Sequence, residues 1–495
     1  MASPHLEISE RTARAPLADD GAEAARLPLV VDLDRTLIAT DSLQEQLAAC
    51  LFRRPLVLLR ALPHLLRGRA ALKAALAGEG GFSPEALPLR DDLVEWLRGE
   101  AAKGRPIHLC TASNQAVAQA MADRVGVFAS ATGSGMANLK GKAKAAHLVR
   151  SFPEGFCYAG DSRADLAVWR EADRIVLAGA SPAVARAARR LGKPIEAEFA
   201  NQPLGLADAL KALRVHHWSK NALIFVPLIL GHGWSSLHTV ASTALGLLCL
   251  LLATSATYLI NDIADLEADR RHWSKRHRAL ASGRMSLTFG FAFAVAALAV
   301  AMATAFLLAV DFALTLSTYI VLTLAYSFGL KRVPLLDTLI IGILFTSRLA
   351  MGIALAGHDY SEWLLTFSVF FFFSLAIAKR HTEIVRAGDN VSHALDSRGY
   401  RIEDGPLTLV LGVSASLASL VIMALFIVEQ VRQRNLYGHP SLLWGIPLLL
   451  SIWIGRVWLL AHRGEMTDDP VSFALRDWAS WLLGGAVAAV FLAAL

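Results

Sequence analysis

The sequence predicts a chain of two unlike parts: an N-terminal α/β domain with a helical cap, and a C-terminal all-α membrane bundle of about nine transmembrane helices. Residues 1 to 210 carry charges every few positions and contain no apolar run near the ~20 residues needed to cross a bilayer. From Leu223 onward, apolar runs of that length repeat to the end of the sequence. The overall composition, 55% hydrophobic over 495 residues, therefore averages a soluble part and a polytopic membrane part.

The composition of the sequence indicates the compartment of the protein and the kinds of molecule that it binds. The first 26 residues mix both charge signs around no apolar core, so we expect a flexible N-terminus and no signal peptide. The cysteines form no Cys-x-x-Cys pair, which argues against zinc and suits a reducing compartment. The formal net charge of +6 is explained by basic cytoplasmic loops beside anionic lipid headgroups, so we expect no nucleic-acid partner.

Three apolar segments of the first part end in polar side chains. These segments are residues 27–31, 106–110 and 156–160. The polar residues that follow them are, in order, Asp32 with Asp34, Thr111, and Asp161 with Asp165. Open α/β sheets bind their ligands at the carboxyl ends of their strands, so these side chains are candidates for one site. An amine could come from Lys140, Lys142 or Lys144, which precede the third segment.

The order and spacing of these segments resemble the four motifs of the haloacid dehalogenase-like phosphatase superfamily, over about residues 27–190. We place this Rossmann-like domain at 27–195. The resemblance implies that Asp32 is a nucleophile that becomes an aspartyl phosphate and that Asp34 is the general acid and base. It implies phosphoryl contacts from Thr111 and Lys144, with Lys140 and Lys142 as alternatives to the latter. It also implies a Mg²⁺ site built from carboxylates: Asp32, Asp34, Asp161 and Asp165.

A helical stretch between Ile38 and Arg105 has a basic, apolar core at residues 51–67. In the resembled family an insertion here is a cap over the active site, although the same composition also fits a helix lying on a membrane surface. Arg35 stands where that family commonly has Gly, so it could narrow access or contact a phosphate. Two alternatives to a phosphatase stay open for this domain. The acids at the strand ends could be incidental to an ordinary α/β domain, or the fold could be kept as a scaffold that has lost its catalytic activity.

The second part is expected to cross the membrane about nine times. The expected spans are 217–233, 237–260, 286–307, 311–329, 335–355, 364–380, 405–429, 441–461 and 472–495. Lys and Arg concentrate in the loops after the second, fourth and sixth spans, which places these loops and the N-terminal domain on the cytoplasmic side. Arg432 and Arg434, after the seventh span, break this pattern. We expect an integral protein of a bacterial-type inner membrane.

Carboxylates cluster directly after the second span. Asn261, Asp262, Asp265 and Asp269 follow its apolar run, and a continuing helix would line the three acids along one face. Hard oxygen ligands in this arrangement suit Mg²⁺ together with substrate phosphate oxygens. The basic residues that follow could hold the rest of a diphosphate: Arg270, Arg271, Lys275, Arg276 and Arg278. The alternative is a solvated, charged loop between membrane helices.

This pattern resembles the first Asp-rich motif of the UbiA-type prenyltransferase superfamily, over about residues 208–495. We place the transferase domain at 214–495, after a linker at 196–213. The resemblance extends to Lys220 and Asn221 before the first span, and to Tyr326, Lys331 and Asp337 between the fourth and fifth. It implies Mg²⁺-dependent transfer of a prenyl or related group from a diphosphate donor, with Lys220, Lys275 and Arg278 clamping the diphosphate.

One departure indicates the branch of the superfamily. Most members carry a second Asp-rich motif after the sixth span, where this sequence has Lys379, Arg380 and Glu383. It is similar here to the branch that transfers phosphoribose from phosphoribosyl diphosphate to polyprenyl phosphate. The lipid phosphate would be held by Lys379, Arg380 or Arg348, although Arg348 could instead pair with a neighbouring acid or carbonyl. Likewise, Tyr326 could be an interfacial aromatic, and Asp337 could only pair with Lys331.

The fusion suggests two consecutive steps, because a phosphoribosyl-lipid carries a 5-phosphate that the N-terminal domain could hydrolyse. One alternative is prenyl transfer from an isoprenoid diphosphate to an aromatic or other small acceptor. Another is a lipid-binding or transport scaffold with a regulatory phosphatase domain. The length of the prenyl chain and the formation of a homo-oligomer stay open.

Overall fold

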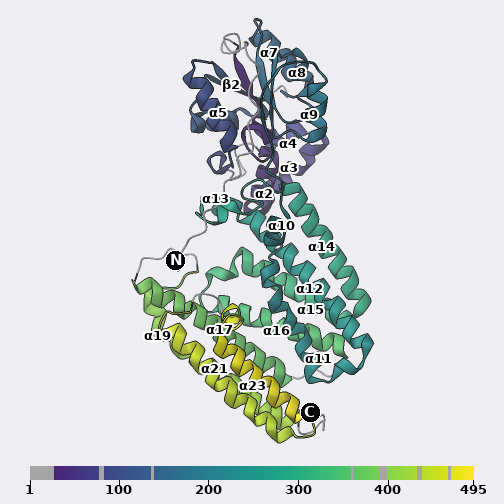
Figure 1. Cartoon of the computed structure of the whole chain (residues 1–495), viewed down its shortest axis with the longest axis vertical. Helices are drawn as coiled ribbons and strands as arrows, with labels where there is room; N and C mark the ends of the chain where they lie inside the picture. Colours follow the sequence, from purple (N-terminus) through teal and green to yellow (C-terminus); the bar gives the residue numbers. More distant parts are fainter. Residues whose placement is uncertain are drawn as a thin grey trace, which may run out of the picture. The chain divides into compact units, whose positions relative to one another are not determined.

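The computed structural model describes residues 27–67, 69–76, 83–134, 139–357, 362–389, 398–431, 437–466 and 470–495. The chain forms two compact units, coloured along the sequence in Figure 1. The first unit is Met1–Ala209 with Asp262–Gly290, and the second is Leu210–Asn261 with Phe291–Leu495. The expected flexible N-terminus, residues 1–26, lies outside the described residues, as do Arg432 and Arg434.

The first unit contains a six-stranded parallel sheet in the order β3-β2-β1-β4-β5-β6. Its strands are β1 (Leu29–Val31), β2 (Ile107–Asn114), β3 (Ser130–Ser134), β4 (Cys157–Gly160), β5 (Arg174–Ala178) and β6 (Ile195–Phe199). Central strand β1 pairs Val31 with Leu109 of β2 on one side and with Ala159 of β4 on the other. The predicted α/β class is confirmed, and the ends of β1, β2 and β4 meet at one edge of the sheet.

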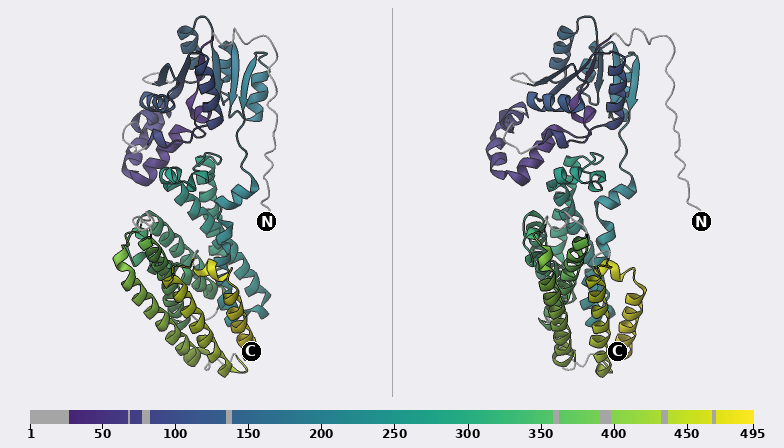
Figure 2. Two further views of the ribbon diagram at one scale, coloured as in Figure 1. Left: turned by 60° about the vertical axis from the view of Figure 1, so that its left-hand side comes forward. Right: turned by 90° about the vertical axis from the view of Figure 1, so that its left-hand side faces the viewer.

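Helices cover both faces of this sheet (Figure 2). One face carries α5 (Asp91–Ala102) and α6 (Gln115–Val125), which pack on Leu29 and Val31. The other face packs on Val30 and carries α7 (Lys142–Ser151), α8 (Leu166–Glu171) and α9 (Pro182–Arg189). Alternate side chains of β1 therefore enter two separate apolar cores, as expected for a strand buried on both faces.

The stretch between β1 and β2 is helical, as predicted. We call it the helical insertion, and it comprises α2 (Ser42–Arg53), α3 (Pro55–Ala61), η2 (Leu62–Arg67) and α4 (Arg69–Leu76). Asp41 caps α2 by accepting hydrogen bonds from the backbone of Leu43 and Gln44. A small apolar core joins these helices around Cys50, Ala61, Leu72 and Leu76.

Among the residues that the structure describes, seven helices are long and apolar enough to cross a membrane. They are α12 (Leu237–Ala264), α14 (Leu287–Leu308), α15 (Val310–Phe328), α16 (Leu336–Ala356), α17 (Glu362–Asp389), α19 (Gly405–Phe426) and α21 (Gly445–His462). They match seven of the nine expected spans. The first and ninth correspond to shorter apolar helices, Trp218–Leu230 and Trp478–Ala494. The first of these is largely a 3₁₀ helix, η4 (Val215–Phe225), before the short α11 (Val226–Leu230).

Short elements complete the described chain. They are the tight turn η1 (Leu33–Leu37), η3 (Pro84–Ala86), α10 (Leu206–Ala212), η5 (Gly233–Ser235), α13 (Leu266–Arg271), η6 (Lys275–His277), η7 (Leu330–Arg332), η8 (Ile402–Asp404), η9 (Ile427–Val431), η10 (Pro440–Trp444), α22 (Pro470–Ala474) and α23 (Trp478–Ala494). The segment 196–213, expected as a linker, is not plain linker, because it begins within β6 and contains α10.

Candidate functional site

The tight turn η1, which follows β1, positions Asp32 and Asp34 in the first candidate site. Asp32 accepts a hydrogen bond from the backbone N–H of Leu33 at 2.8 Å. Arg35 has φ 59° and ψ −1°, a left-handed conformation that costs a non-glycine residue roughly 1 kcal/mol. Nη2 of Arg90 donates to the carbonyl oxygen of Arg35 at 3.2 Å. This bond helps to hold the backbone that carries Asp32 and Asp34.

The structure separates the three candidate lysines. Lys140 and Lys142 are exposed, whereas Lys144 is 2% exposed. Nζ of Lys144 lies 2.9 Å from Oδ1 of Asp32 and donates to the hydroxyl of Tyr158 at 2.9 Å. Although burial opposes its charged form, the carboxylates of Asp32 and Asp165 raise the pKa of Lys144. The geometry therefore favours Lys144 as the amine of this site.

Tyr158 is a site residue that sequence reasoning missed. Its buried hydroxyl accepts from Lys144 and donates to Oδ1 of Asp165 at 3.0 Å. Asp165 also accepts from the backbone and hydroxyl of Ser162, at 2.9 and 2.6 Å. The only sequence signal was a tyrosine in the apolar strand before Gly160.

Three carboxylates converge at the edge of the sheet. Asp32, Asp161 and Asp165 each offer an oxygen, and these oxygens lie within 4.8 Å of one another. Burial, followed by the charges of Asp165 and Asp32, raises the pKa of Asp161 to about 8. Burial also raises the pKa of Asp32 to about 6. Crowded carboxylates of this kind favour a bound cation, and their hard oxygens suit Mg²⁺. Three of the four predicted carboxylates therefore form a group that fits the ion, and Asp34 is not part of this group.

Asp34 is oriented by two serines that the sequence did not single out. Its Oδ1 accepts from the backbone N–H of Ser42 at 2.7 Å, and its Oδ2 accepts from the hydroxyl of Ser113 at 2.9 Å. Ser42 begins α2, so the helical insertion supplies one contact to the site. The backbone N–H of Ser113 donates to the buried hydroxyl of Thr111 at 3.1 Å, which fixes that predicted residue at the same edge.

The second candidate site is the Asp-rich segment after α12. The helix does not continue through this segment, because α12 ends at Ala264 and Asp265 has φ −93° and ψ 8° before α13 begins. Asp262 and Asp269 still converge, since Nη1 of Arg278 lies 3.1 Å from Oδ1 of Asp262 and 2.5 Å from Oδ2 of Asp269. Asn261 lies at the end of the same apolar helix, beside Asp262.

The guanidinium of Arg278 lies between the two carboxylates. Asp262 and Asp269 are 5% and 3% exposed, and burial raises the pKa of Asp269. Two buried carboxylates need positive charge between them, so the pair fits Mg²⁺ once Arg278 turns away. Nζ of Lys275 lies 4.0 Å from Oδ1 of Asp269, with 46% of its side chain exposed.

Two residues of the basic run have acidic partners in this structure. Arg270 donates to both carboxylate oxygens of Glu45, at 2.7 and 3.0 Å, and to a backbone carbonyl. Arg271 pairs with Glu267 at 2.5 Å. Arg270 and Arg271 therefore form ion pairs within the first unit. Lys275 and Arg278 are the residues of the basic run that lie beside the carboxylates of Asp262 and Asp269.

In the second unit, two cations flank one aromatic ring. The guanidinium carbon of Arg348 lies 5.2 Å from the ring centre of Phe345, and Nζ of Lys220 lies 5.9 Å from it. Arg348 donates to Oδ1 of Asn221 at 2.8 Å and to the hydroxyl of Tyr319 at 3.1 Å. It also donates to the carbonyl oxygen of Leu344 in its own helix, whereas the expected alternative was an acid or carbonyl of a neighbouring span. Its partners in these bonds are neutral, which leaves a buried positive charge suited to an anion.

A second cluster of the second unit is built around Asp337. Its fully buried carboxylate accepts from Nε of Arg380 at 2.8 Å and from the hydroxyl of Tyr400 at 2.6 Å. Arg380 also pairs with Glu383 at 2.5 Å, so both its neighbours are acids. Lys379 and Lys331 are half-buried. These contacts favour a structural role for Arg380 as the partner of Asp337.

Arg398 and Tyr400 were not predicted. Nη1 of Arg398 lies 4.0 Å from Oδ2 of Asp337 and donates to the hydroxyl of Tyr326 at 2.6 Å. The available signal was the Arg-Gly-Tyr sequence before the seventh span, where Gly399 has φ 74°. These residues bring a further positive charge to the Asp337 cluster.

Comparisons with known proteins agree with the membrane part of this description. The UbiA prenyltransferase family model matches residues 222–483, just over half of the chain. The uncharacterized protein y4nM of Sinorhizobium fredii is 47% identical over 471 residues, covering 95% of this chain and 91% of that protein. Decaprenyl-phosphate phosphoribosyltransferase of Corynebacterium glutamicum is 34% identical over 203 residues, covering 39% of this chain and 61% of that enzyme.

A solved structure of a UbiA homolog from Archaeoglobus fulgidus, bound to GPP and Mg²⁺, aligns with a TM-score of 0.43 and 18% identity. The alignment covers 58% of this chain and 98% of that one. The family match spans the helices that carry both clusters of the second unit, apart from Lys220 and Asn221, which precede it. The chain is an integral membrane transferase and belongs to the UbiA prenyltransferase family.

Proposed function

We propose that the membrane domain transfers phosphoribose from phosphoribosyl diphosphate to a polyprenyl phosphate. The observation that carries the proposal is the charge of the Asp337 cluster, where Arg380 and Arg398 lie against Asp337 and Glu383. Lys379 precedes Arg380 in the sequence and adds a further cation to this segment. A second metal site would need surplus acid at this position, whereas an anionic acceptor needs surplus cation. The partial similarity to decaprenyl-phosphate phosphoribosyltransferase supports the same assignment.

The reaction joins two anions, so charge neutralisation is its main requirement. The bond from the anomeric carbon to the diphosphate oxygen breaks, and an oxygen of the lipid phosphate bonds to that carbon. Lys275 and Arg278 offset the charge of the leaving diphosphate, and Arg278 exchanges its carboxylate partners for phosphate oxygens. Mg²⁺ held by Asp262 and Asp269 would supply further electrostatic stabilisation of the leaving group.

The acceptor phosphate is assigned to the second unit. Lys379 and Arg398 are its proposed ligands in the Asp337 cluster. The two cations beside Phe345, Lys220 and Arg348, are proposed to contact a further phosphate of either substrate. Tyr326, which accepts from Arg398, orients that arginine.

For the N-terminal domain we propose hydrolysis of a phosphomonoester, with the 5-phosphate of the lipid product as its substrate. The segments that end at Asp32, Thr111 and Asp161 resemble those of haloacid dehalogenase-like phosphatases, and they meet at one sheet edge. Asp32 attacks phosphorus while Asp34, oriented by Ser42 and Ser113, protonates the departing alcohol. Water then releases phosphate from the aspartyl phosphate, with Asp34 accepting its proton. Mg²⁺ would offset charge on the phosphoryl oxygens.

Prenyl transfer to an aromatic acceptor is the second candidate, since the matching family is named for prenyl transfer. Purified full-length protein with Mg²⁺ should be given phosphoribosyl diphosphate plus polyprenyl phosphate, and separately isoprenoid diphosphates plus aromatic acids. Mass spectrometry of the lipids distinguishes the two. A prenylated aromatic product with no ribosylated lipid would replace our proposal with the second candidate.

We also propose that the first unit lies on the cytoplasmic side, following the loops rich in Lys and Arg. Val149 is 43% exposed on α7, so Val149→Cys offers a site for a membrane-impermeant thiol reagent. This cysteine should react only after the cells are permeabilised. Reaction in intact cells would place the domain outside.

A further inference from the structure

The outer face of the helical insertion exposes a row of leucines. Leu56, Leu59, Leu62 and Leu66 are 68%, 62%, 45% and 93% exposed. They recur every three or four residues along α3 and η2, so they follow one side of the helical path. We call these four residues the leucine row. A row of this kind on a water-facing surface costs free energy, and it marks a surface that meets an apolar partner.

The inner face of the same helix already has its partners. Val57, Leu58 and Ala61 pack into the small core with Cys50 and Leu72. A surface helix of a soluble domain normally carries polar residues opposite such a face. α3 instead carries leucines on both sides, so the leucine row is not explained by the packing of the insertion.

The charge around the row indicates which partner fits. From Gln46 to Gly78 the sequence contains six basic residues and no acidic one: Arg53, Arg54, Arg60, Arg67, Arg69 and Lys73. A basic helix with an apolar face is typical of segments that lie in the interface of an anionic bilayer. Arg60, adjacent to Leu59 in sequence, is exposed. Anionic headgroups would offset this charge, whereas a second copy of the same basic surface would repel it.

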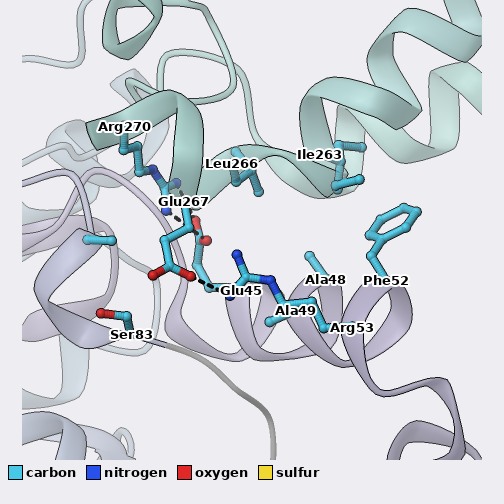
Figure 3. A pocket seen from close by; sticks show the side chains of 12 residues that line it. Glu45, Ala48, Ala49, Phe52, Arg53, Ser83, Ile263, Leu266, Glu267 and Arg270 are labelled. Atoms are coloured by element: carbon cyan, nitrogen blue, oxygen red, sulfur yellow. Dashed lines mark hydrogen bonds and ion pairs between the residues drawn. The ribbon is translucent and has the colours of Figure 1, made fainter. Parts of the chain in front are cut away.

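Contacts within the first unit join the insertion to α13. Arg270 of α13 pairs with Glu45 of α2, and Arg53 of α2 pairs with Glu267 of α13 (Figure 3). The Arg270–Glu45 pair is buried, at 8% and 4% side-chain exposure. A pocket between α2 and α13 is lined by apolar groups as well, including Phe52.

The chain fixes where α13 lies. It begins two residues after the membrane-spanning helix α12 ends at Ala264, so it stays near the bilayer surface. Trp273, two residues after α13, is 79% exposed, and tryptophan favours the membrane–water interface. The insertion that α13 holds is therefore also within reach of that surface.

We propose that the leucine row, with Arg60 beside it, docks on the anionic surface of the bilayer in which the same chain is embedded. Docking would hold the Asp32 site above lipid-linked molecules, because Ser42 of the same insertion contacts Asp34. The proposal does not depend on which phosphomonoester the site accepts, since it concerns only where the insertion lies.

The test uses the full-length protein in nanodiscs that contain phosphatidylglycerol. The four native cysteines are buried, so Leu59→Cys gives one accessible site for an environment-sensitive fluorophore. Lipids that carry a nitroxide on the acyl chain then report contact by quenching. Val149→Cys, on exposed α7 of the same unit, is the matched control.

We expect lipid-borne quenching at position 59 and none at position 149. Arg60→Gln should lower the ratio of docked to undocked insertion about fivefold, because each basic residue near an anionic surface contributes about 1 kcal/mol. Leu66→Cys provides a second labelled position, and the outward direction of both leucines leaves the core untouched. If lipid-borne nitroxides quench the fluorophore at none of positions 59, 66 and 149, and a water-soluble quencher acts equally on all three, the proposal is overturned. Pyrene excimers at position 59 without lipid quenching would also overturn it, and would identify a second copy as the partner.

Discussion

One nitrogen of Arg278, Nη1, contacts both Asp262 and Asp269, at 3.1 and 2.5 Å. The three residues come from the end of α12, from α13 and from the loop beyond η6, and the two acids are almost fully buried. A single guanidinium thus neutralises two carboxylates across a break in the helix. We propose that the two acids form a cation site in which Arg278, a side chain that can also bind phosphate, takes the place of the ion.

Asp262→Asn should abolish formation of lipid-linked product while the protein stays inserted and folded. A neutral amide is a poorer ligand for a hard divalent cation, so we expect a loss of about 100-fold or more. Asp265→Asn should have the same effect if the third acid also serves the metal. Product formation is followed by mass spectrometry of extracted lipid.

Glu267→Gln is the matched control for these variants. It removes a carboxylate of the same segment whose partners are Arg53 and Arg271. Activity close to wild type is expected for it. Wild-type turnover in Asp262→Asn would contradict the metal assignment.

The Asp337 cluster allows two neighbouring cations to be distinguished. Lys379→Gln should raise the KM for polyprenyl phosphate more than the KM for the diphosphate donor, since the half-buried amine is proposed to contact the acceptor. A change confined to the donor's KM would place the acceptor elsewhere.

Arg380→Gln should act on stability instead. It leaves the fully buried carboxylate of Asp337 without its guanidinium, which costs about 3–5 kcal/mol in comparable buried pairs. The expected result is a lower Tm in detergent. An unchanged Tm together with a raised KM for the lipid would return Arg380 to the role of an acceptor ligand.

Tyr158→Phe tests the hydrogen-bonded chain behind Asp32. The variant removes the hydroxyl that joins Lys144 to Asp165, with both partners left in a buried site. We expect kcat for phosphate release to fall about tenfold and KM to change little, because loss of a buried hydrogen bond costs about 1–3 kcal/mol. A Tyr158→Phe enzyme with normal kcat would show that the hydroxyl serves only packing.

The sequence predicted the first site better than the second for a physical reason. Parallel strands share the edge at which their carboxyl ends emerge, so Asp32, Thr111 and Asp161 had to meet once the strands were recognised. The break at Asp265 could not be seen, because the spacing of the acids suits a continuous helix equally well.

Other features depend on partners distant in the sequence. The pairing of Arg270 with Glu45 joins residues 225 positions apart, so a local basic run gave no sign of it. Tyr400 reaches Asp337 across 63 positions in the same way. The first expected span is apolar enough, but much of it is wound as a 3₁₀ helix before α11, which local hydropathy does not reveal.

We propose that one chain forms a phosphorylated sugar-lipid and then removes its 5-phosphate. Asp32→Asn is the variant that separates the two steps, because it removes the nucleophile and leaves the second unit unchanged. Asp123→Asn, an exposed acid on α6 of the same domain, is its control.

The most direct measurement is the mass of the lipid product that each of these proteins makes from phosphoribosyl diphosphate and polyprenyl phosphate with Mg²⁺. Wild type and Asp123→Asn should yield ribosyl-lipid and free phosphate. Asp32→Asn should accumulate the 5-phosphorylated lipid at an undiminished rate. A wild-type protein that yields only the 5-phosphorylated lipid, with no Mg²⁺-dependent release of phosphate, would contradict the claim.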